Sequence, residues 1–393
     1  MKLNRIFRGA TRNELQQIAT RLIFFLSGMG MSAWAPLIPF VKDNTGVNDS
    51  MLGLLLFCIG AGSMLVMPYS GYIIGRLGCR MVILAAGFFL CIDLVFLIFF
   101  SSALCLAFAL LLFGAINGIM DIAMNTHAVI VERESSKSKM SGFHGFYSFG
   151  SIFGAGSVSL LLWAGLSPLH AIYIIALFIA FLLLIAGGDL RTNRQRSFQP
   201  HKTPLNVLSH RGLLFIAWLC FIVFLTEGAM LDWSSLFLIT QRGIDSSFAG
   251  AGFTLYAISM TLARLSGDGL IRNHGAFAVL ASGGLIAAAG LLLVILVDNT
   301  WISFGGLILA GAGIANIVPI LFTLAGNYKS VPPAHALPAV TLMGYMGLLT
   351  GPAMLGFIAH HTNLTFAFGL PIVFLLLVSM SAKRLTREYN FSK

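Results

Sequence analysis

Long apolar stretches separated by short polar links run along the whole chain of 393 residues. A helix of roughly 20 apolar residues crosses the bilayer core of about 30 Å, so each such stretch predicts one membrane-spanning helix. Twelve stretches meet this condition: 20–40, 51–74, 81–100, 103–131, 143–165, 168–188, 212–238, 248–271, 276–297, 301–325, 336–359 and 364–382. The pattern therefore predicts an all-α membrane protein with twelve transmembrane helices.

One link is longer and more polar than the others, and it divides the predicted helices six and six. Residues 189–211 form this link and contain several Lys and Arg residues. We expect an N-terminal six-helix bundle over 1–188, a cytoplasmic linker over 189–211 and a C-terminal six-helix bundle over 212–393.

Composition and charge exclude several classes of protein. Hydrophobic residues make up 58% of the chain and charged residues only 10%, whereas soluble domains carry about 25% charged residues. A soluble enzyme, a disordered chain and a disulfide scaffold are thereby excluded.

The formal net charge of +10 could suggest a nucleic-acid partner, but the position of the charges argues against one. With the N-terminus inside, nearly all Lys and Arg residues fall in inner segments, and only Lys42 and Arg242 fall outside. Cytoplasmic loops accumulate such residues. We therefore expect a multi-pass protein of the bacterial inner membrane with both termini in the cytoplasm.

The two halves of the chain repeat. The first span carries Phe25 and Trp34, which recur 199 residues later as Phe224 and Trp233. Further predicted pairs are Gly71 with Gly267, Arg76 with Arg272, Gly78 with Gly275, Asp121 with Asn316, and Gly150 with Gly351. Two six-helix halves related by an axis along the membrane normal are typical of one class of transporter, in which the substrate binds between the halves.

The link between the second and third spans carries a family motif. Its sequence, GYIIGRLGCR, places Gly71, Arg76, Gly78 and Arg80 at matching positions of the G-x-x-x-D-R-x-G-R loop, with Gly75 at the usual acidic position. The chain thus resembles the major facilitator superfamily (MFS). Three further motifs, at 143–156, 226–233 and 344–352, are similar to those of the YbjJ-type bacterial inner-membrane proteins, near the fucose-permease-like sugar:proton symporters. The resemblance implies the MFS fold and gating by the loop residues.

Polar side chains inside predicted spans are functional candidates, because an ionisable group at bilayer depth is costly unless it has a partner or faces a cavity. Asn117, Asp121 and Asn125 follow one another at i, i+4 and i+8 and form one stripe on a helix. We expect this stripe to line the central cavity, with Asp121 as a proton carrier or an acceptor for substrate. The alternative is a hydrogen bond from Asp121 to a neighbouring helix.

Glu227 is the first candidate for proton coupling. It lies in the outer half of the seventh predicted span, which has no cation of its own, and burial there disfavours the charged form of a carboxyl group. The alternative is a hydrogen bond at an outer gate, to Tyr256 or a backbone group. Asp232, five residues further out, suits a gating or structural role.

Other polar and aromatic residues have two open interpretations each. Trp34 and Trp233 could stack on a sugar ring or anchor the helices at the interface. His144 and Tyr147 could form an inner gate with Glu132–Arg133–Glu134, although a packed histidine is the commoner case. Arg264, the intramembrane cation, could form a structural clamp with Asp268 at the inner face or bind a substrate anion. Asn316 is expected on the substrate-binding surface.

These features predict a secondary active transporter that works by alternating access, with proton-coupled uptake of a small polar, sugar-like solute. The alternative is proton-driven efflux of hydrophobic or cationic compounds, against which Ala155 replaces the proline of the antiporter motif G-x-x-x-G-P. No P-loop motif supports ATP hydrolysis, and no enzyme, cofactor or metal site is expected. The expected partners are a small-molecule substrate, protons and the lipid bilayer, without nucleic acid, and we expect a monomer.

Overall fold

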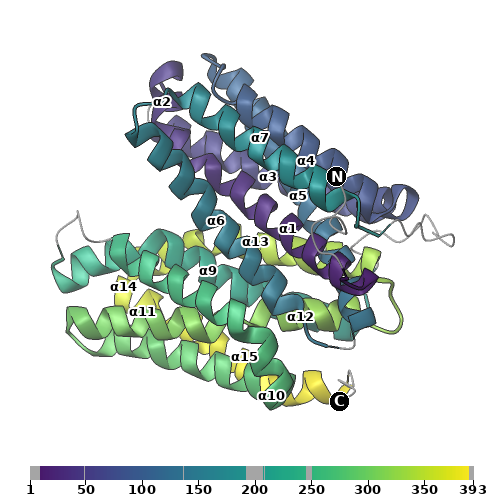
Figure 1. Cartoon of the computed structure of the whole chain (residues 1–393). Helices are drawn as coiled ribbons and strands as arrows, with labels where there is room; N and C mark the ends of the chain where they lie inside the picture. Colours follow the sequence, from purple (N-terminus) through teal and green to yellow (C-terminus); the bar gives the residue numbers. More distant parts are fainter. Residues whose placement is uncertain are drawn as a thin grey trace. The chain divides into compact units, whose positions relative to one another are not determined.

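The computed structural model describes residues 9–47, 49–135, 137–191, 207, 209–244 and 250–388, and within these ranges it is helical without strands (Figure 1). Packing divides the chain into two compact units. Unit 1 is built from the described residues of 1–136, 146–206 and 333–338, and unit 2 from those of 137–145, 207–332 and 339–393. Most of the predicted linker 189–211 lies outside the described residues.

The helices follow the chain in order. Those of the first half are α1 (Arg12–Ala33), the short 3-10 helix η2 (Ala35–Leu37), α2 (Ile38–Thr45), α3 (Asp49–Leu77), α4 (Cys79–Phe96), α5 (Ala103–Ser135), α6 (Met140–Trp163) and α7 (Pro168–Gly187). Those of the second half are α9 (Arg211–Arg242), α10 (Gly250–Leu296), α11 (Thr300–Ile314), α12 (Ile317–Gly326), α13 (Pro333–His361), α14 (Leu364–Ala367) and α15 (Gly369–Glu388). In unit 2, α10 packs against α11 and α15 (Figure 1).

Eleven of the described helical stretches are long and apolar enough to cross a membrane. One of them, Ala251–Leu296, has 46 residues and would measure about 69 Å as a single straight helix, more than twice the bilayer core. It is interrupted at Gly275, whose φ of 80° and ψ of 156° are not helical. With α10 counted as two spans, each predicted membrane helix has its counterpart, and the all-α membrane fold is confirmed.

The interruption at Gly275 repeats a turn of the first half. Gly78 joins α3 directly to α4 with φ 84° and ψ 151°, almost the values of Gly275. Residues with a Cβ atom rarely adopt such a positive φ, so glycine is required at both places. The same one-residue turn at the same point of each half supports the predicted duplication.

Proline interrupts another helix, between α11 and α12. The two helices meet at Ala315 and Asn316, shortly before Pro319. Proline has no N–H, so Pro319 cannot donate the helical hydrogen bond to the carbonyl of Ala315, four residues earlier. The Ala315 carbonyl is thereby left for a donor from elsewhere in the protein.

Glycines bring neighbouring helices into backbone contact. A Cβ atom on Gly114 of α5 would run into the carbonyl oxygen of Ile59 in α3, and one on Gly118 would lie against Ser63. The Ser63 hydroxyl donates a 2.7 Å hydrogen bond to the Gly114 carbonyl across the same contact. Without a hydrophobic force between helices in lipid, close packing of small residues and interhelical hydrogen bonds such as these help to hold the helices together.

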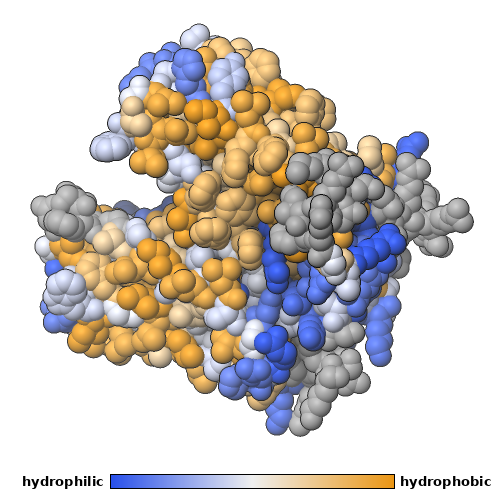
Figure 2. Space-filling view, viewed as in Figure 1, coloured by the Kyte–Doolittle hydropathy of each residue, from blue (hydrophilic) through white to orange (hydrophobic). Residues whose placement is uncertain are grey.

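The exposed surface is that of a membrane protein. Figure 2 shows apolar residues over much of the visible flanks of the helices and hydrophilic residues gathered at helix ends. Large apolar side chains such as Leu104, Leu177, Phe357 and Met380 are mostly exposed. A soluble surface would not expose so many of them, so the chain is a multi-pass membrane protein.

Candidate functional site

A buried ion pair lies near the middle of two helices of unit 2. Arg264 of α10 donates from Nη2 to Oε1 of Glu227 in α9 over 2.9 Å. The side chains are only 10% and 20% exposed, respectively. Glu227 lies just beyond the midpoint of the 32-residue helix α9. Arg264 thus pairs with Glu227, 37 positions away in the chain, and its predicted clamp with Asp268 stays a prediction.

The break before Pro319 helps to position the arginine. Arg264 Nε donates a 3.0 Å hydrogen bond to the carbonyl of Ala315, which Pro319 leaves without its helical donor. An unsatisfied carbonyl is costly in a membrane interior. The guanidinium therefore satisfies this carbonyl and the Glu227 carboxylate together, which orients it.

A tyrosine hydroxyl without a hydrogen bond lies near this pair. Tyr256 of α10 is 2% exposed, and its hydroxyl has no partner in the described part of the chain. The side chain is close enough to interact electrostatically with both Glu227 and Arg264. The predicted alternative of a hydrogen bond between Glu227 and Tyr256 is therefore wrong.

Two more unpartnered polar atoms adjoin the same region. Asn316 donates from Nδ2 to the carbonyl of Ala263 over 3.1 Å, while its Oδ1 has no partner in the described residues. The fully buried hydroxyl of Ser141 is likewise unpartnered there. Both side chains lie against Gly267, one turn beyond Arg264. Asn316, predicted on the substrate surface, is thus next to the arginine network.

The first residues of α6 belong to unit 2 and contact α10 and α12. The backbone N–H of Gly142 donates to Asp268 Oδ1 over 3.1 Å. His144 packs edge-on against Phe322, with ring centroids 5.6 Å apart, and interacts electrostatically with Arg264. His144 therefore has a packing role on α12, and its gating role with the Glu132–Arg133–Glu134 cluster stays a prediction.

Matching backbone contacts align the two halves more accurately than the sequence. In each half, two glycines allow the backbones of the first and the fifth membrane helix to touch. The equivalent contacts are Gly28 to Tyr147 and Gly150 to Phe25 in unit 1, and Gly228 to Leu348 and Gly351 to Leu225 in unit 2. The offset between α1 and α9 is thus 200, and the predicted value of 199 is wrong by one residue.

The corrected alignment shows that the ion pair has no counterpart in unit 1. Glu227 corresponds to Ser27, not to Gly28. Gly114 of α5 lies against the carbonyl of Ile59 in α3, and Gly311 of α11 lies against the carbonyl of Tyr256 in α10 in the same way. The offset between α3–α5 and α10–α11 is therefore 197. Arg264, Tyr256 and Asn316 then correspond to Met67, Ile59 and Ile119. The polar cluster of unit 2 stands where unit 1 is almost wholly apolar, so pseudo-symmetric packing does not explain it.

Unit 1 carries a different polar feature on α5. Asn125 is fully buried and donates from Nδ2 to Asp121 Oδ1 over 3.1 Å. Asn117 instead donates to the carbonyl of Phe113 over 2.8 Å. The stripe also has no polar counterpart in unit 2, where the corresponding residues are Ile314, Val318 and Phe322.

The two tryptophans differ in position. Trp34 ends α1, is 4% exposed and has an indole N–H without a partner in the described residues. Trp233 is half-buried within α9 and lies against Gly356. Under the corrected offset Trp34 corresponds to Ser234, so the predicted symmetric pair is wrong. Asp232, next to Trp233, is exposed.

The loop motif of the first half forms the tight turn between α3 and α4. Gly71 in α3 lies against the backbone of Ala334, and Arg76 donates to the hydroxyl of Tyr72 over 3.2 Å. Gly78 makes the turn, and Arg80 is half-buried at the start of α4.

The buried side chain of His127 forms a hydrogen-bond network at one end of unit 1. His127 Nε2 accepts from the backbone N–H of Arg191 over 3.1 Å, and its Nδ1 lies 3.2 Å from the Thr20 hydroxyl. Thr20 donates its own proton to the Gln16 carbonyl, so it can accept from Nδ1–H of a neutral imidazole. The Arg191 guanidinium pairs with Glu134. The network ties α1, α5 and the end of α7 together.

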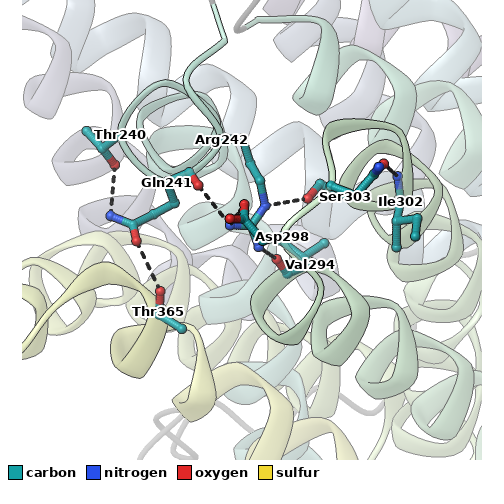
Figure 3. A network of polar contacts seen from close by, with 9 residues as sticks. Thr240, Gln241, Arg242, Val294, Asp298, Ile302, Ser303 and Thr365 are labelled. Atoms are coloured by element: carbon teal, nitrogen blue, oxygen red, sulfur yellow. Dashed lines mark hydrogen bonds and ion pairs between the residues drawn. The ribbon is translucent and has the colours of Figure 1, made fainter.

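Arg242 forms a second structural network, at the end of α9 (Figure 3). Its guanidinium donates to the Ser303 hydroxyl over 3.0 Å, to the Val294 carbonyl over 2.5 Å and to Asp298 Oδ1 over 3.2 Å. Gln241 connects the same end to Thr365 of α14 (Figure 3). These contacts explain why an arginine lies at this end of the helix, and no functional role is needed to explain it.

Long apolar helices with charged and amide side chains at mid-helix define a polytopic membrane protein of the transporter class. The Major Facilitator Superfamily profile matches residues 22–336. The chain belongs to this superfamily.

Relatives of known sequence are similar along their whole length. An uncharacterized MFS-type transporter of Yersinia pestis is 49% identical over 95% of this chain and 96% of its own. Membrane protein MosC of Rhizobium meliloti is 30% identical over 93% and 88%. NarT of Staphylococcus aureus, described as a probable nitrate transporter, is 26% identical over 93% of each chain.

Solved structures share the fold at low identity. The MFS transporter FucP in its outward conformation matches with a TM-score of 0.82 and 16% identity, over 95% of this chain and 99% of FucP. The human organic anion transporter MFSD10 matches with a TM-score of 0.79 and 16% identity, over 95% and 100%. The predicted superfamily is confirmed.

Proposed function

We propose that this MFS transporter is a secondary active transporter that couples the movement of a small polar solute to protons by alternating access. Its relatives do not decide the solute, because FucP is described as a fucose:proton symporter and NarT as a probable nitrate transporter. The proposal therefore depends on the side chains of the chain itself.

The observation that carries the proposal is the Glu227–Arg264 pair. A proton-coupling group must bind and release a proton during each cycle, and the surrounding protein must respond to its charge. Glu227 suits this task because its ionised form accepts a hydrogen bond from Arg264, which also donates to the neutral carbonyl of Ala315. Protonation of Glu227 weakens the bond between the two side chains and leaves the bond to Ala315, so the arginine can move.

Asp121 is the second candidate for the proton. Its Oδ1 accepts from Asn125, a neutral donor, so its charge has weaker support than that of Glu227. We propose that Asn117 and Asn125 help to bind substrate from unit 1, and that Asn316 and Trp233 do so from unit 2. Gating by His144, Tyr147, Asp232 and Asp268, by the loop residues Gly71, Arg76, Gly78 and Arg80, and by Arg264 itself stays a prediction.

We further propose that the protein lies in a bacterial inner membrane as a monomer with both termini in the cytoplasm. The excess of Lys and Arg in the predicted inner segments supports this orientation. The two six-helix bundles, 1–188 and 212–393, would then be joined by a cytoplasmic linker.

The test measures proton flux in proteoliposomes with a pH-sensitive dye, with a panel of sugars and then of lipophilic cations. Proton entry on addition of a polar solute supports the proposal. Glu227→Gln should abolish proton-driven accumulation but leave counterflow exchange intact, whereas Asp43→Asn, which changes an exposed acid of α2, should leave both intact. Proton release on addition of lipophilic cations would instead establish efflux.

If Asp121→Asn, and not Glu227→Gln, removes only the proton-driven step, the coupling role passes to Asp121. Loss of exchange as well as accumulation in Glu227→Gln would contradict a pure coupling role, because exchange needs no net proton movement. Melting temperatures of both variants establish that they are folded.

A further inference from the structure

We propose that Asp93 is a separate proton-binding site of the protein, in unit 1, and that its switching partner is the indole N–H of Trp34. The two side chains are unbonded while Asp93 holds a proton, as in this structure, and they form a hydrogen bond when Asp93 is ionised. The site involves neither Glu227 nor the solute, so it goes beyond the proposed function.

The first observation concerns two buried polar atoms of unit 1. Asp93 of α4 is 5% exposed, and its Oδ2 atom has no hydrogen-bond partner in the described residues. Trp34, directly after α1, is 4% exposed, and its Nε1–H group is likewise without a partner there. Buried polar atoms are nearly always bonded, so each unbonded one requires an explanation. One of these atoms accepts and the other donates, so each can supply what the other lacks.

Both residues lie at one level of unit 1, where α1, α4 and α7 run side by side (Figure 1). A Cβ atom on Gly30 of α1 would lie 2.6 Å from Leu90 of α4 and 3.6 Å from Ile179 of α7, so the three helices meet there. Trp34 is four residues beyond Gly30, and Asp93 is three residues beyond Leu90, which is one turn further on the same face of each helix. The first and third membrane helices cross in the same direction, because each helix reverses the one before it. These two turns are therefore neighbours.

The pair is not a consequence of the fold that the two halves share. With the offsets given above, Asp93 corresponds to Gly290 and Trp34 to Ser234. Gly290 packs against the carbonyl of Gly306, so the second half uses this position for a close helix contact. The first half places a carboxyl group at the same position, where the packing of the helices requires no polar side chain.

The surroundings of Asp93 disfavour its charged form as long as no donor is bonded to it. Among the described side chains, no charged group acts electrostatically on Asp93. An ionised carboxylate at membrane depth is costly without a partner, so Asp93 holds a proton in this state. The titratable residues that the packed elements carry toward this end of unit 1 are Asp49 and Cys58 in α3, Cys105 in α5, His170 and Tyr173 in α7, and Lys42 and Asp43 in α2.

A break in the first membrane helix lets the bond form. The α-helix α1 changes to the 3-10 helix η2 directly after Trp34, and Pro36 in η2 cannot donate a helical hydrogen bond to the carbonyl of Ser32. The Ser32 hydroxyl donates a 2.6 Å hydrogen bond to the carbonyl of Ser151 in α6, which holds α1 in place just before the break. Helices bend where proline interrupts them. A small rotation at the break can therefore bring the Trp34 N–H to Asp93 while α1 stays packed.

The proton on Asp93 thereby controls the bend of the first membrane helix. When Asp93 ionises, the O–H bond of its carboxyl group breaks, the proton passes to water, and the carboxylate accepts from the Trp34 N–H. Asp93 is three residues from the end of α4, so the path to water is short. In the predicted topology this end of unit 1 faces the outside, and the switch would respond to the external pH.

The experiment titrates the purified full-length protein in lipid nanodiscs between mildly acidic and mildly alkaline pH. Infrared difference spectra follow the C=O band of a protonated carboxyl group, and the band that is missing in Asp93→Asn belongs to Asp93. Ultraviolet resonance Raman spectra report whether an indole N–H is hydrogen-bonded, and the difference from Trp34→Phe isolates the signal of Trp34.

We expect the Asp93 band to disappear as the pH rises, with the slope of a single proton, while the Trp34 N–H becomes hydrogen-bonded over the same pH range. In Asp93→Asn the Trp34 signal should not respond to pH. In Trp34→Phe, Asp93 should bind its proton about tenfold to a hundredfold more tightly, as for the loss of a hydrogen bond to a charged group.

The matched controls remove exposed residues of the same kinds from unit 1. Asp43→Asn and Trp163→Phe should change neither signal. Glu227→Gln should also change neither, so failure of the proposed coupling at Glu227 and failure of this inference are distinguished. If a lower melting temperature shows that Asp93→Asn is not folded, Asp93→Ala, which buries no polar side chain, takes its place.

An Asp93 that stays protonated, or stays ionised, over the whole pH range would overturn the proton site. A Trp34 signal that is constant while Asp93 titrates, or that still changes with pH in Asp93→Asn, would overturn Trp34 as the partner. A response of either signal to Glu227→Gln would contradict the separation of the two sites.

Discussion

Breaking the Glu227–Arg264 pair from either side should destabilise the protein more than removing both charges. In Arg264→Met the carboxylate loses its partner and the Ala315 carbonyl loses its donor. In Glu227→Gln the guanidinium keeps its charge and loses the carboxylate to which it is bonded. The double variant removes both charges of the pair.

The structure sets the size of these effects. Removal of one partner of a buried pair costs about 3–5 kcal/mol, whereas replacing both partners is often nearly neutral. Glu227 is 20% exposed and can take up a proton, so for Arg264→Met we expect the lower end, about 3 kcal/mol. For units of this size, that loss corresponds to a melting temperature lower by about 6–12 °C. The double variant should recover most of it.

The assay is thermal unfolding in detergent, followed by fluorescence at pH 7.5 and at pH 5.5. The loss in Arg264→Met should shrink at pH 5.5, because a protonated Glu227 no longer buries a charge. The loss in Glu227→Gln should shrink less, because glutamine does not titrate and arginine stays charged, so only titration of Glu227 in the unmodified protein changes it. Arg272→Met, which removes an exposed cation of α10, should change stability by no more than about 0.5 kcal/mol.

Additive losses would refute the reasoning. If the double variant is less stable than the unmodified protein by the sum of the two single losses, the two side chains do not stabilise each other. Equal losses of Arg264→Met at both pH values would show that the unpaired Glu227 charge is not the cause.

Two further predictions concern the backbone around the site. Pro319→Ala supplies an N–H that competes with Arg264 for the Ala315 carbonyl, so the pH profile of transport should shift while the melting temperature is unchanged or higher; an unchanged profile would contradict the positioning role. Gly306→Val places a side chain against the carbonyl of Gly290 and should lower stability by about 1–3 kcal/mol, as overpacking does. The neighbouring Gly305→Val faces open space and is the control, so equal melting temperatures would count against close packing of α10 and α11.

The sequence alone determined the membrane fold and much of the list of candidates. Bilayer thickness imposes a helix length, so apolar stretches of that length could be counted and matched to α1–α15. The glycine at the turn after α3 and its repeat at Gly275 were visible because no other residue tolerates that backbone conformation. Glu227, Arg264 and Asp121 were conspicuous because an ionisable residue is rare and costly at that depth.

Tertiary structure alone decided which of these residues meet. Spacing along one helix could suggest only Asp268 as a partner for Arg264, since residues four apart share a face. The bond to Glu227 became visible only in the folded protein, because α9 and α10 pack against each other and bring distant positions together. Likewise, the register of the repeat was misjudged by one residue. Lipid-facing and core positions accept many apolar side chains interchangeably, so the sequence weakly constrains the register, whereas backbone contacts at Gly28 and Gly228 admit only one alignment.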